Sequence, residues 1–352
     1  MNPRHIAFPS INQFRSVVKN IRSSAEWHNV PFPTVTFEVS VKVHGTNFSV
    51  CRHVGGGVDD MWVQSRENII TPLKDNAGLA MFVHANRELF GGLLDVIEAA
   101  SEETDTNKVI QLFGEGFGGN IQKGVGVSGL PKSINIFGIR ISEDAASSEW
   151  KQKGFYDLVF DASYLSQLNS QNIYAKYQFP VWYIDVDFNK PEVSQNALVE
   201  LTEAVEKDCP VARFFKPDAD VGSLVGEGIV CTPIQKDDIG FDVRQHFFKC
   251  KGEKHANSKV RTIASIDVEK VSSIDEFVEN CLTENRLQQG LSKLEEMGLP
   301  KNITSMGAAI SWVVRDTIKE ELDTLAASGL VPKDVTGKLS VKARNFYLEH
   351  LE

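Results

Sequence analysis

Residues 39–50, "VSVKVHGTNFSV", alternate apolar and polar side chains as a half-buried β-strand does, with a lysine, a histidine and a glycine in the middle. Successive side chains of a strand point to opposite faces, so we predict that Lys42, His44 and Thr46 share one face and the intervening valines the other. If the polar face meets a cleft, Lys42 is a candidate nucleophile, and Gly45 would let a ligand approach the backbone closely. An exposed strand face ending at a glycine would have the same sequence, so this stretch alone does not decide the function.

On both sides of this stretch, β-rich segments are interrupted irregularly by helical patterns. Two segments, 76–100 and 194–208, have apolar residues at the three- and four-residue spacing of an amphipathic helix. Because strands and helices do not alternate one for one, we predict a mixed, largely antiparallel α+β domain and not a doubly wound parallel sheet. The predicted strands lie in "TVTFEVSVKV", "DMWVQSR", "KVIQLFGEG", "SINIFGIRI", "FPVWYIDVDF", "EGIVCTPI" and "QHFFKCKG".

The pattern changes toward the end of the chain, where three successive segments carry helical periodicity. Ser273 followed by Glu276 is a capping-box pattern for the first helix, and Gly298 and Gly329 are suited to helix ends. We therefore predict two domains, an α+β domain at 1–262 and a small all-α domain at 263–352.

The composition is that of an ordinary globular protein, with 352 residues, 42% hydrophobic content and a formal net charge of -10. The negative charge argues against nucleic acid as a partner, because phosphate binding usually leaves a basic footprint on the whole domain, but "FKCKGEKH" at 248–255 offers local positive charge for a cleft. No apolar run approaches the roughly 20 residues of a membrane span, and the first residues lack the apolar core of a signal peptide. The five cysteines are scattered without a C-x-x-C pair, which indicates reduced thiols. We expect a monomeric cytoplasmic protein with no membrane partner.

Four further motifs follow Lys42 along the chain, and each has an ordinary structural explanation on its own. Glu115 in "FGEGFGG" is a carboxylate at the end of a strand, and Phe137 in "INIFGIRI" is typical of a core aromatic. Glu227 in "GEGIVCTP" comes at the start of a strand, and Lys249 and Lys251 in "FFKCKGEKH" share one strand face because they are two residues apart. Only their order along the chain indicates a common site.

In this order the motifs resemble those of the covalent nucleotidyltransferase superfamily of ligases and capping enzymes. The wording "KVHGTNFS", with histidine where DNA ligases and capping enzymes usually have aspartate, resembles the RNA ligase 2 type of phage double-stranded RNA ligases and their kinetoplastid RNA-editing relatives. So do "FGEGFGGNIQKGV", the pair Ser65-Arg66 and "TENRLQQGLSKL". The resemblance covers nearly the whole chain. It implies a nucleotidyltransferase (ATP-grasp-like ligase) domain followed by a helical domain. DNA ligases and capping enzymes have a β-barrel domain at that place in the chain.

The resemblance implies an ATP-dependent RNA ligase that acts in RNA repair. Such an enzyme seals 3′-hydroxyl/5′-phosphate nicks in double-stranded RNA or an RNA-containing duplex. Lys42 would attack the α-phosphorus of ATP and carry AMP before passing it to the RNA end. An ordinary lysine, with a pKa of about 10.4, is almost all ammonium at neutral pH, so positive charge from Lys249, Lys251 and bound Mg²⁺ (or Mn²⁺), or desolvation, is needed to free the amine. A phage-encoded enzyme would act in the host cytoplasm.

The resemblance also implies roles for the remaining residues of the site. Glu115 would hydrogen-bond the ribose, Phe137 would stack on the adenine, and Glu227 would help to hold the metal. The expected ATP-binding and AMP-binding set is Val41, Lys42, Val43, Arg66, Glu115, Phe137, Glu227, Lys249 and Lys251. The expected set for the nick and the sealing steps is His44, Thr46, Asn47 and Arg66.

Two positions depart from close relatives, which often have an acid just before the nucleophile lysine and another just after the stacking phenylalanine. Val41 and Gly138 stand there, so the way adenine is selected stays open. For His44, a structural hydrogen bond across the sheet is the alternative to a catalytic role. For the whole protein, the alternatives are a capping-type guanylyltransferase, a DNA ligase, or a non-catalytic RNA-binding protein with a degenerate nucleotide pocket.

Overall fold

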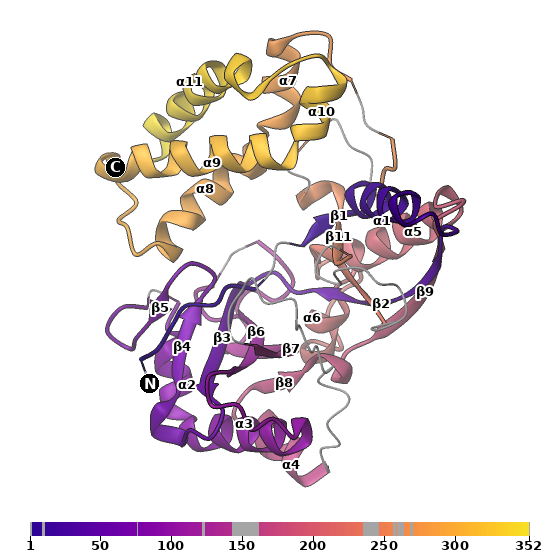
Figure 1. The fold of residues 1–352 in the computed structure, drawn as a ribbon. Helices are drawn as coiled ribbons and strands as arrows, with labels where there is room; N and C mark the ends of the chain where they lie inside the picture. Colours follow the sequence, from indigo (N-terminus) through magenta and orange to yellow (C-terminus); the bar gives the residue numbers. More distant parts are fainter. Residues whose placement is uncertain are drawn as a thin grey trace.

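The chain folds into a larger part built on two β-sheets and a smaller part built of helices (Figure 1). The computed structural model describes residues 2–8, 11–75, 77–121, 124–142, 162–234, 246–255, 258, 264–267 and 270–351. The predicted class, a largely antiparallel α+β domain followed by helices, is confirmed. The boundary expected at 262–263 lies outside the described residues.

The first sheet has five strands in the order β1-β11-β10-β2-β9. All neighbours are antiparallel except β1 and β11, which run parallel. The strands are β1 (Asn12–Gln13), β2 (Thr34–Lys42), β9 (Val181–Asp187), β10 (Gly228–Pro233) and β11 (Phe248–Lys251).

The second sheet has six strands in the order β5-β4-β3-β6-β7-β8. Its neighbours are also antiparallel, with the exception of the parallel pair β7 and β8. The strands are β3 (Thr46–His53), β4 (Trp62–Ser65), β5 (Ile69–Ile70), β6 (Val109–Phe117), β7 (Ser133–Ser142) and β8 (Ile173–Ala175).

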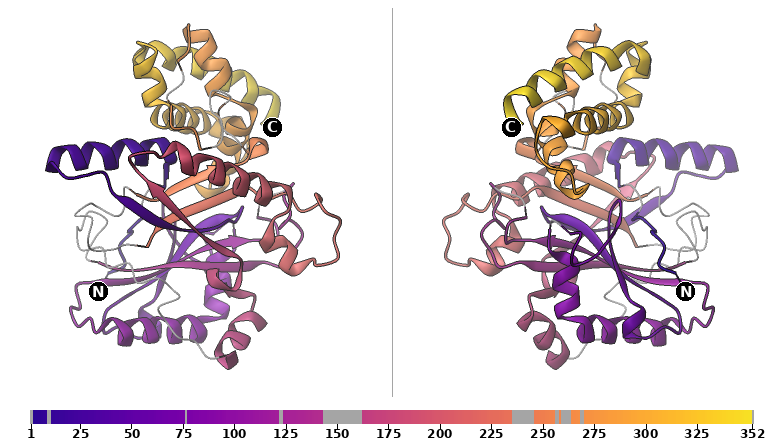
Figure 2. Two further views of the ribbon diagram at one scale, coloured as in Figure 1. Left: turned by 90° about the vertical axis from the view of Figure 1, so that its right-hand side faces the viewer. Right: turned by 90° about the vertical axis from the view of Figure 1, so that its left-hand side faces the viewer.

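Helices cover the outer face of each sheet (Figures 1 and 2). Apolar side chains of β2 such as Phe37 pack against α1 (Phe14–His28) and α5 (Glu192–Lys207) in one core. Apolar side chains of β3 such as Phe48 pack against α2 (Leu79–Ala85) and α3 (Arg87–Ser101) in another. Because side chains alternate along a strand, the polar residues between these apolar ones line the inner faces. Among the described residues this part also contains two shorter helices, α4 (Ala162–Ser170) and α6 (Pro210–Phe215), and the 3₁₀ turns η1 (Val58–Asp60), η3 (Lys176–Gln178) and η5 (Glu253–His255).

The quoted stretch 39–50 is two strands and not one, which corrects the single-strand interpretation. The chain leaves the five-stranded sheet after Lys42, turns through residues 43–45 and enters the six-stranded sheet at Thr46. Gly45 permits this crossing, because a β-carbon there would lie 2.2 Å from the carbonyl oxygen of Gly116 on β6. The close neighbour of Gly45 is therefore protein backbone and not the ligand that was expected there.

The first predicted helix is divided in two, and the second is confirmed as α5. Asn86 separates α2 from α3, and its side-chain amide donates a hydrogen bond to the carbonyl oxygen of Phe82 at 3.0 Å. An asparagine that bonds the backbone in this way competes with helix continuation. Residue 76, at the start of the predicted segment, lies outside the described residues.

The C-terminal part has its own apolar core and only helices among its described residues. The Ser273 hydroxyl accepts a hydrogen bond from the Glu276 amide at 3.1 Å, which confirms Ser273 as the N-cap, whereas the Glu276 carboxylate accepts from the amide of Ser272 at 2.6 Å, so the reciprocal bond of a capping box is shifted by one residue. Gly298 and Gly329 adopt φ angles of 72° and 70°, which confirms the predicted helix stops. The elements are α7 (Ile274–Cys281), α8 (Glu284–Glu296), η6 (Ile303–Ser305), α9 (Met306–Glu320), α10 (Leu322–Ala327) and α11 (Pro332–His350). No helix in the described portion is long and apolar enough to cross a membrane.

Candidate active site between the two sheets

The nucleophile candidate sits in a row of residues that crosses three strands. Lys42 ends β2, and the strand register pairs it with Gly228 of β10, which is paired in turn with Lys251 of β11. Gly228 leaves the space between the two lysines free of a side chain. A β-carbon there would lie 2.1 Å from the carbonyl oxygen of Cys250, and the φ of 145° also favours glycine. The row therefore brings together two amines that are 209 positions apart in the chain, as 251 minus 42.

Glu227 lies between these amines and pairs with both. One carboxylate oxygen is 2.6 Å from Lys42 Nζ and 3.1 Å from His44 Nδ1, and the other is 2.9 Å from Lys251 Nζ. Burial by itself would raise the pKa of the Glu227 carboxyl, but the charges of Lys251 and Lys42 and the hydrogen bond from His44 outweigh it and hold this pKa well below its usual range. The site thus holds a buried carboxylate that stays ionised among cations.

Lys249 and Lys251 share the inner face of β11, as predicted, but they have different partners. Lys249 Nζ lies 3.2 Å from a carboxylate oxygen of Glu320 on α9, so the helical part supplies a counter-charge to the site. Glu320 acts to raise the pKa of Lys249, yet burial and the charges of Lys251 and Lys42 together lower it. For Lys251, burial would lower the pKa, but the attraction of Glu227 raises it. The pKa values of these two neighbouring lysines are thus shifted in opposite directions.

The ribose candidate Glu115 lies in the other sheet, on β6. The register of β3 and β6 pairs Glu115 with Asn47 and pairs Thr46 with Gly116. Thr46 is buried and Asn47 is half-buried. The structure therefore brings these three predicted residues together at the start of β3, directly after the turn that follows Lys42.

Phe137 owes its placement to a β-bulge in β7. Phe113 pairs with Gly138 and the next residue of β6 pairs with Ile136, so Phe137 is the extra residue without a cross-strand partner. Bulges redirect the side chain they carry and often occur near active sites. Phe137 is half-buried, and a β-carbon on Gly138 would meet nothing within 4 Å. The position after Phe137, where relatives often have an acid, is thus open space.

Three predicted residues stand apart from the charged cluster. The side chains of Val41 and Val43 are 7% and 5% exposed and belong to the apolar core, so only their backbone could touch a nucleotide. Arg66 is exposed on the turn between β4 and β5. Its neighbour Glu67 pairs at 3.0 Å with Lys293 of α8. The helical part therefore contacts the predicted site at two places, one on each sheet.

Sequence reasoning missed the residues that α8 and α9 contribute. Arg286 is fully buried and lies 3.0 Å from Glu320, and Asp316 lies 3.7 Å from Arg286. The motif "TENRLQQGLSKL" contains Arg286 and Lys293, so the resemblance offered a signal for them. Nothing local marks Glu320, because an acid on an amphipathic helix usually faces water.

A divalent metal fits this site only together with a ligand that brings oxygens. The described residues contain no group of three or more His, Cys, Asp or Glu side chains that could hold a metal ion. Glu227 is the buried carboxylate among the candidate residues. Mg²⁺ is commonly bound by one or two carboxylates plus substrate phosphates, and this donor set agrees with that pattern.

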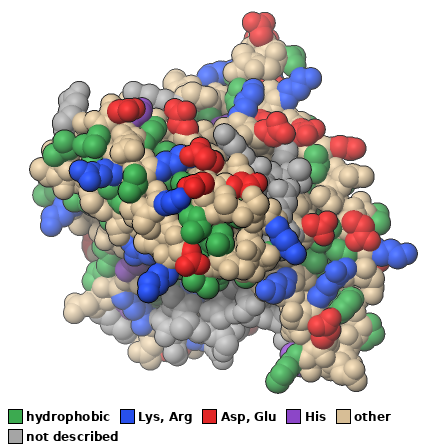
Figure 3. Space-filling model, turned by 90° about the horizontal axis from the view of Figure 1, so that it is seen from above, with side chains coloured by type: hydrophobic (Ala, Val, Ile, Leu, Met, Phe, Trp, Pro, Cys, Tyr) green, Lys and Arg blue, Asp and Glu red, His purple; other side chains and the backbone are tan. Residues whose placement is uncertain are grey.

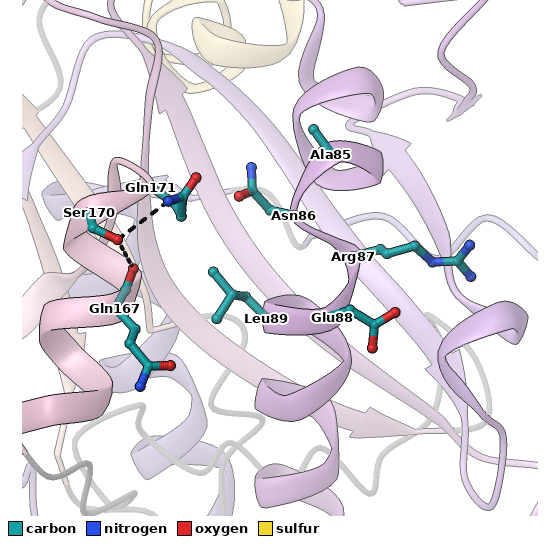
Figure 4. A pocket seen from close by; sticks show the side chains of 8 residues that line it. All are labelled: Ala85, Asn86, Arg87, Glu88, Leu89, Gln167, Ser170 and Gln171. Carbon is teal, nitrogen blue, oxygen red and sulfur yellow. Dashed lines mark hydrogen bonds between the residues drawn. The ribbon is translucent and has the colours of Figure 1, made fainter.

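A separate pocket of about 400 Å³ lies where α2 meets α3, facing α4 (Figure 4). Its lining contains none of the predicted site residues. The lining residues are Ala85, Asn86, Arg87, Glu88, Leu89, Gln167, Ser170 and Gln171.

Comparison with known proteins places these observations in a family. The family model described as RNA ligase matches residues 35–251, which is most of the two-sheet part and more than half of the chain. Among solved structures the chain is similar to Naegleria gruberi RNA ligase. A variant with ATP and Mn has 16% identity and a TM-score of 0.42, and a structure with PPi has 18% identity and a TM-score of 0.41. Each alignment covers 72% of this chain and 58% of that ligase. No curated protein matches.

Proposed function

Because this chain belongs to the RNA ligase family, we propose that it is an ATP-dependent RNA ligase that seals 3′-hydroxyl/5′-phosphate nicks in duplex RNA through a covalent lysyl-AMP. The observation that carries the proposal is the contact of Lys42 with Glu227 and, through it, with Lys251. An amine next to a cluster of cations and one carboxylate suits a nucleophile that must approach a polyphosphate.

The proposed reaction balances charge and atoms in three displacements. Lys42 Nζ gives up a proton to solvent and attacks the α-phosphorus of ATP; a P–N bond forms, the bond to the bridging oxygen breaks, and pyrophosphate leaves. The 5′-phosphate oxygen of the RNA then attacks the same phosphorus, which breaks the P–N bond and gives an adenylylated RNA end, while the departing Lys42 amine takes up a proton from solvent. Finally the 3′-hydroxyl loses its proton and attacks the RNA 5′-phosphorus, and AMP leaves. Lys249 and Lys251 would face the negative charge that grows on the α-phosphate.

Glu227 is the residue proposed to hold Mg²⁺ or Mn²⁺ when ATP is bound. The metal supplies positive charge that offsets the charge of the phosphates. Glu227 would then exchange part of its contact with Lys42 for the metal, which leaves that amine less strongly paired. Phe137 would stack on the adenine, and Glu115 would accept a hydrogen bond from the ribose.

The RNA would be held around the turn after Lys42 and by the helical part. His44, Thr46 and Asn47 follow the nucleophile directly, and Arg66 can hold a phosphate with two donors. The hydrogen bond of His44 to Glu227 is the structural alternative considered for this residue, and its catalytic role stays a prediction. The face seen from above the helices mixes acidic and basic side chains (Figure 3). Since the formal net charge of the chain is -10, we propose that a few local cations, and not a uniformly basic surface, bind the duplex.

The first test is incubation with α-labelled ATP and Mg²⁺. We expect label on the protein that is stable to alkali, released by acid and absent in Lys42→Ala. Glu200→Gln, an exposed acid on α5 remote from the site, is the matched control and should label normally. If the wild-type protein never acquires AMP, the proposed function is wrong.

The second test separates the substrates. Duplexes with a 3′-hydroxyl/5′-phosphate nick in RNA, in DNA or with RNA only on the 3′-hydroxyl side are incubated with each labelled nucleotide. We expect ATP to be used and the RNA nick to be sealed best. Covalent GMP without sealing would indicate a capping-type guanylyltransferase, and sealing of DNA alone would indicate a DNA ligase. The described residues after 270 form helices only, which is unlike the β-barrel of both alternatives.

A further inference from the structure

The N-terminal segment 2–8 is fixed to the inner face of the six-stranded sheet. Ile6 is 2% exposed, and its backbone is bonded on both sides by side chains of the sheet. Its amide donates to Gln64 Oε1 at 3.1 Å, and its carbonyl oxygen accepts from Gln111 Nε2 at 2.9 Å. Arg4 adds a bond to the carbonyl oxygen of Asn107 at 2.6 Å. The segment is therefore attached to β4 and β6, two residues before the aromatic ring of Phe8.

Phe8 packs at the end of this segment against the bulge of β7. Its ring lies 5.4 Å from that of Phe137 at an interplanar angle of 86°, and 4.9 Å from that of Phe113 at 69°. Both are edge-to-face geometries, which aromatic pairs favour. Phe247, next to β11 of the other sheet, lies 6.3 Å away. Phe8 thus bridges the two sheets beside the predicted adenine-stacking ring.

Phe137 needs such a support because of its place in the bulge. A side chain in a regular ladder is held by its cross-strand neighbour, but the register gives Phe137 no such neighbour. Among the aromatic rings of the described chain, Phe8 is in contact with it. A half-buried ring without this contact would populate several orientations, and a base could stack on only some of them.

We propose that Phe8 is a positioning residue for nucleotide binding, because it holds the ring of Phe137 in the orientation that stacks on the adenine of ATP. The inference rests on the proposed function, since it needs a nucleotide at Phe137. Preorganisation of one ring strengthens binding without altering the phosphorus chemistry. The effect should therefore fall on KM for ATP and leave kcat of lysyl-AMP formation nearly unchanged.

The test is a double-mutant cycle on the rate of lysyl-AMP formation at varied ATP concentration. We expect Phe8→Ala to raise KM roughly three- to tenfold, the range of a single aromatic pair. Phe137→Ala should raise it further, and the double variant should be no worse than Phe137→Ala alone. Phe8→Leu keeps most of the side-chain volume of this half-buried residue, so it should melt close to wild type and still raise KM. Phe214→Ala, at a half-exposed ring of a separate aromatic cluster, is the matched control.

The possible results are distinct. Multiplicative effects of the two variants, or an equal loss of kcat with a lowered melting temperature, would reduce Phe8 to a structural role and overturn the proposal. A lower KM in Phe8→Ala would mean that its ring occupies the nucleotide's place, which also overturns it. If wild-type protein forms no lysyl-AMP, the proposed function fails instead, and the two failures can be told apart.

Discussion

Replacing Glu227 by glutamine tests whether one buried carboxylate holds three cationic or polar partners in place. Glu227 contacts Lys42, Lys251 and His44 at 2.6, 2.9 and 3.1 Å, and its side chain is 4% exposed. The glutamine has nearly the same size and can accept hydrogen bonds, but it carries no charge. The variant therefore removes the negative charge and leaves the packing intact.

The expected cost follows from these contacts. At an effective dielectric constant of about 20, a unit charge pair at this spacing attracts by about 6 kcal/mol before desolvation is subtracted. Removal of one partner of a buried pair typically costs about 3–5 kcal/mol. The side chains of Lys42 and Lys251 keep 21% and 16% of their exposure and can recruit water, so we expect the lower end, about 3 kcal/mol.

The pH dependence has a definite sign. Because the folded pKa of Glu227 lies below its unfolded value, the charge stabilises the protein fully above the unfolded pKa of about 4.3. This contribution is lost as the pH falls through the folded pKa. The difference between wild type and Glu227→Gln should therefore be complete at pH 7 and shrink below about pH 4.

Urea unfolding followed by circular dichroism measures this difference, with Glu200→Gln as the control for loss of an exposed charge. Sulfate provides a second readout. An added anion can replace the missing charge between Lys42 and Lys251, so sulfate should stabilise the variant more than the wild type. If Glu227→Gln is as stable as the wild type at pH 7 and gains nothing extra from sulfate, the reasoning about the charged cluster is refuted.

Three further changes are informative. Lys42→Ala should form no lysyl-AMP but still seal a nick with a preadenylylated 5′ end, measured on denaturing gels, and residual AMP labelling would contradict its role. Glu320→Gln removes the carboxylate that pairs with Lys249, so KM for ATP should fall roughly three- to tenfold at low salt. This decrease in KM should vanish at about 1 M salt. An unchanged KM would argue against competition between Glu320 and ATP for Lys249. Gly45→Ala places a β-carbon 2.2 Å from a backbone oxygen of β6 and should lower the free energy of unfolding by about 2–3 kcal/mol. The control Gly138→Ala, whose β-carbon meets nothing within 4 Å, should lower it by under about 1 kcal/mol. Equal losses in the two variants would contradict the role given to Gly45 in the crossing between the sheets.

The strands, the helical end of the chain and the charged cluster were accessible from the sequence. Strand alternation and helical spacing are local properties of the sequence. The apolar periodicity is clearest where one face of a strand packs against α1, α3 or α5. The motif order indicated that Lys42, Glu227 and Lys251 belong to one site, and the register brings them into contact. Other predicted roles, such as ribose binding by Glu115, remain predictions.

The identity of the reactive groups and the type of each element can be predicted from the sequence, because both depend on residues close together in the chain. Three-dimensional packing is needed to learn that the stretch after Val39 crosses from one sheet to the other, that Phe137 occupies a bulge supported by Phe8, and that Glu320 faces Lys249. These features depend on strand register and on packing between distant segments. Alternation fixes the face on which a side chain lies, but not the neighbour it meets there.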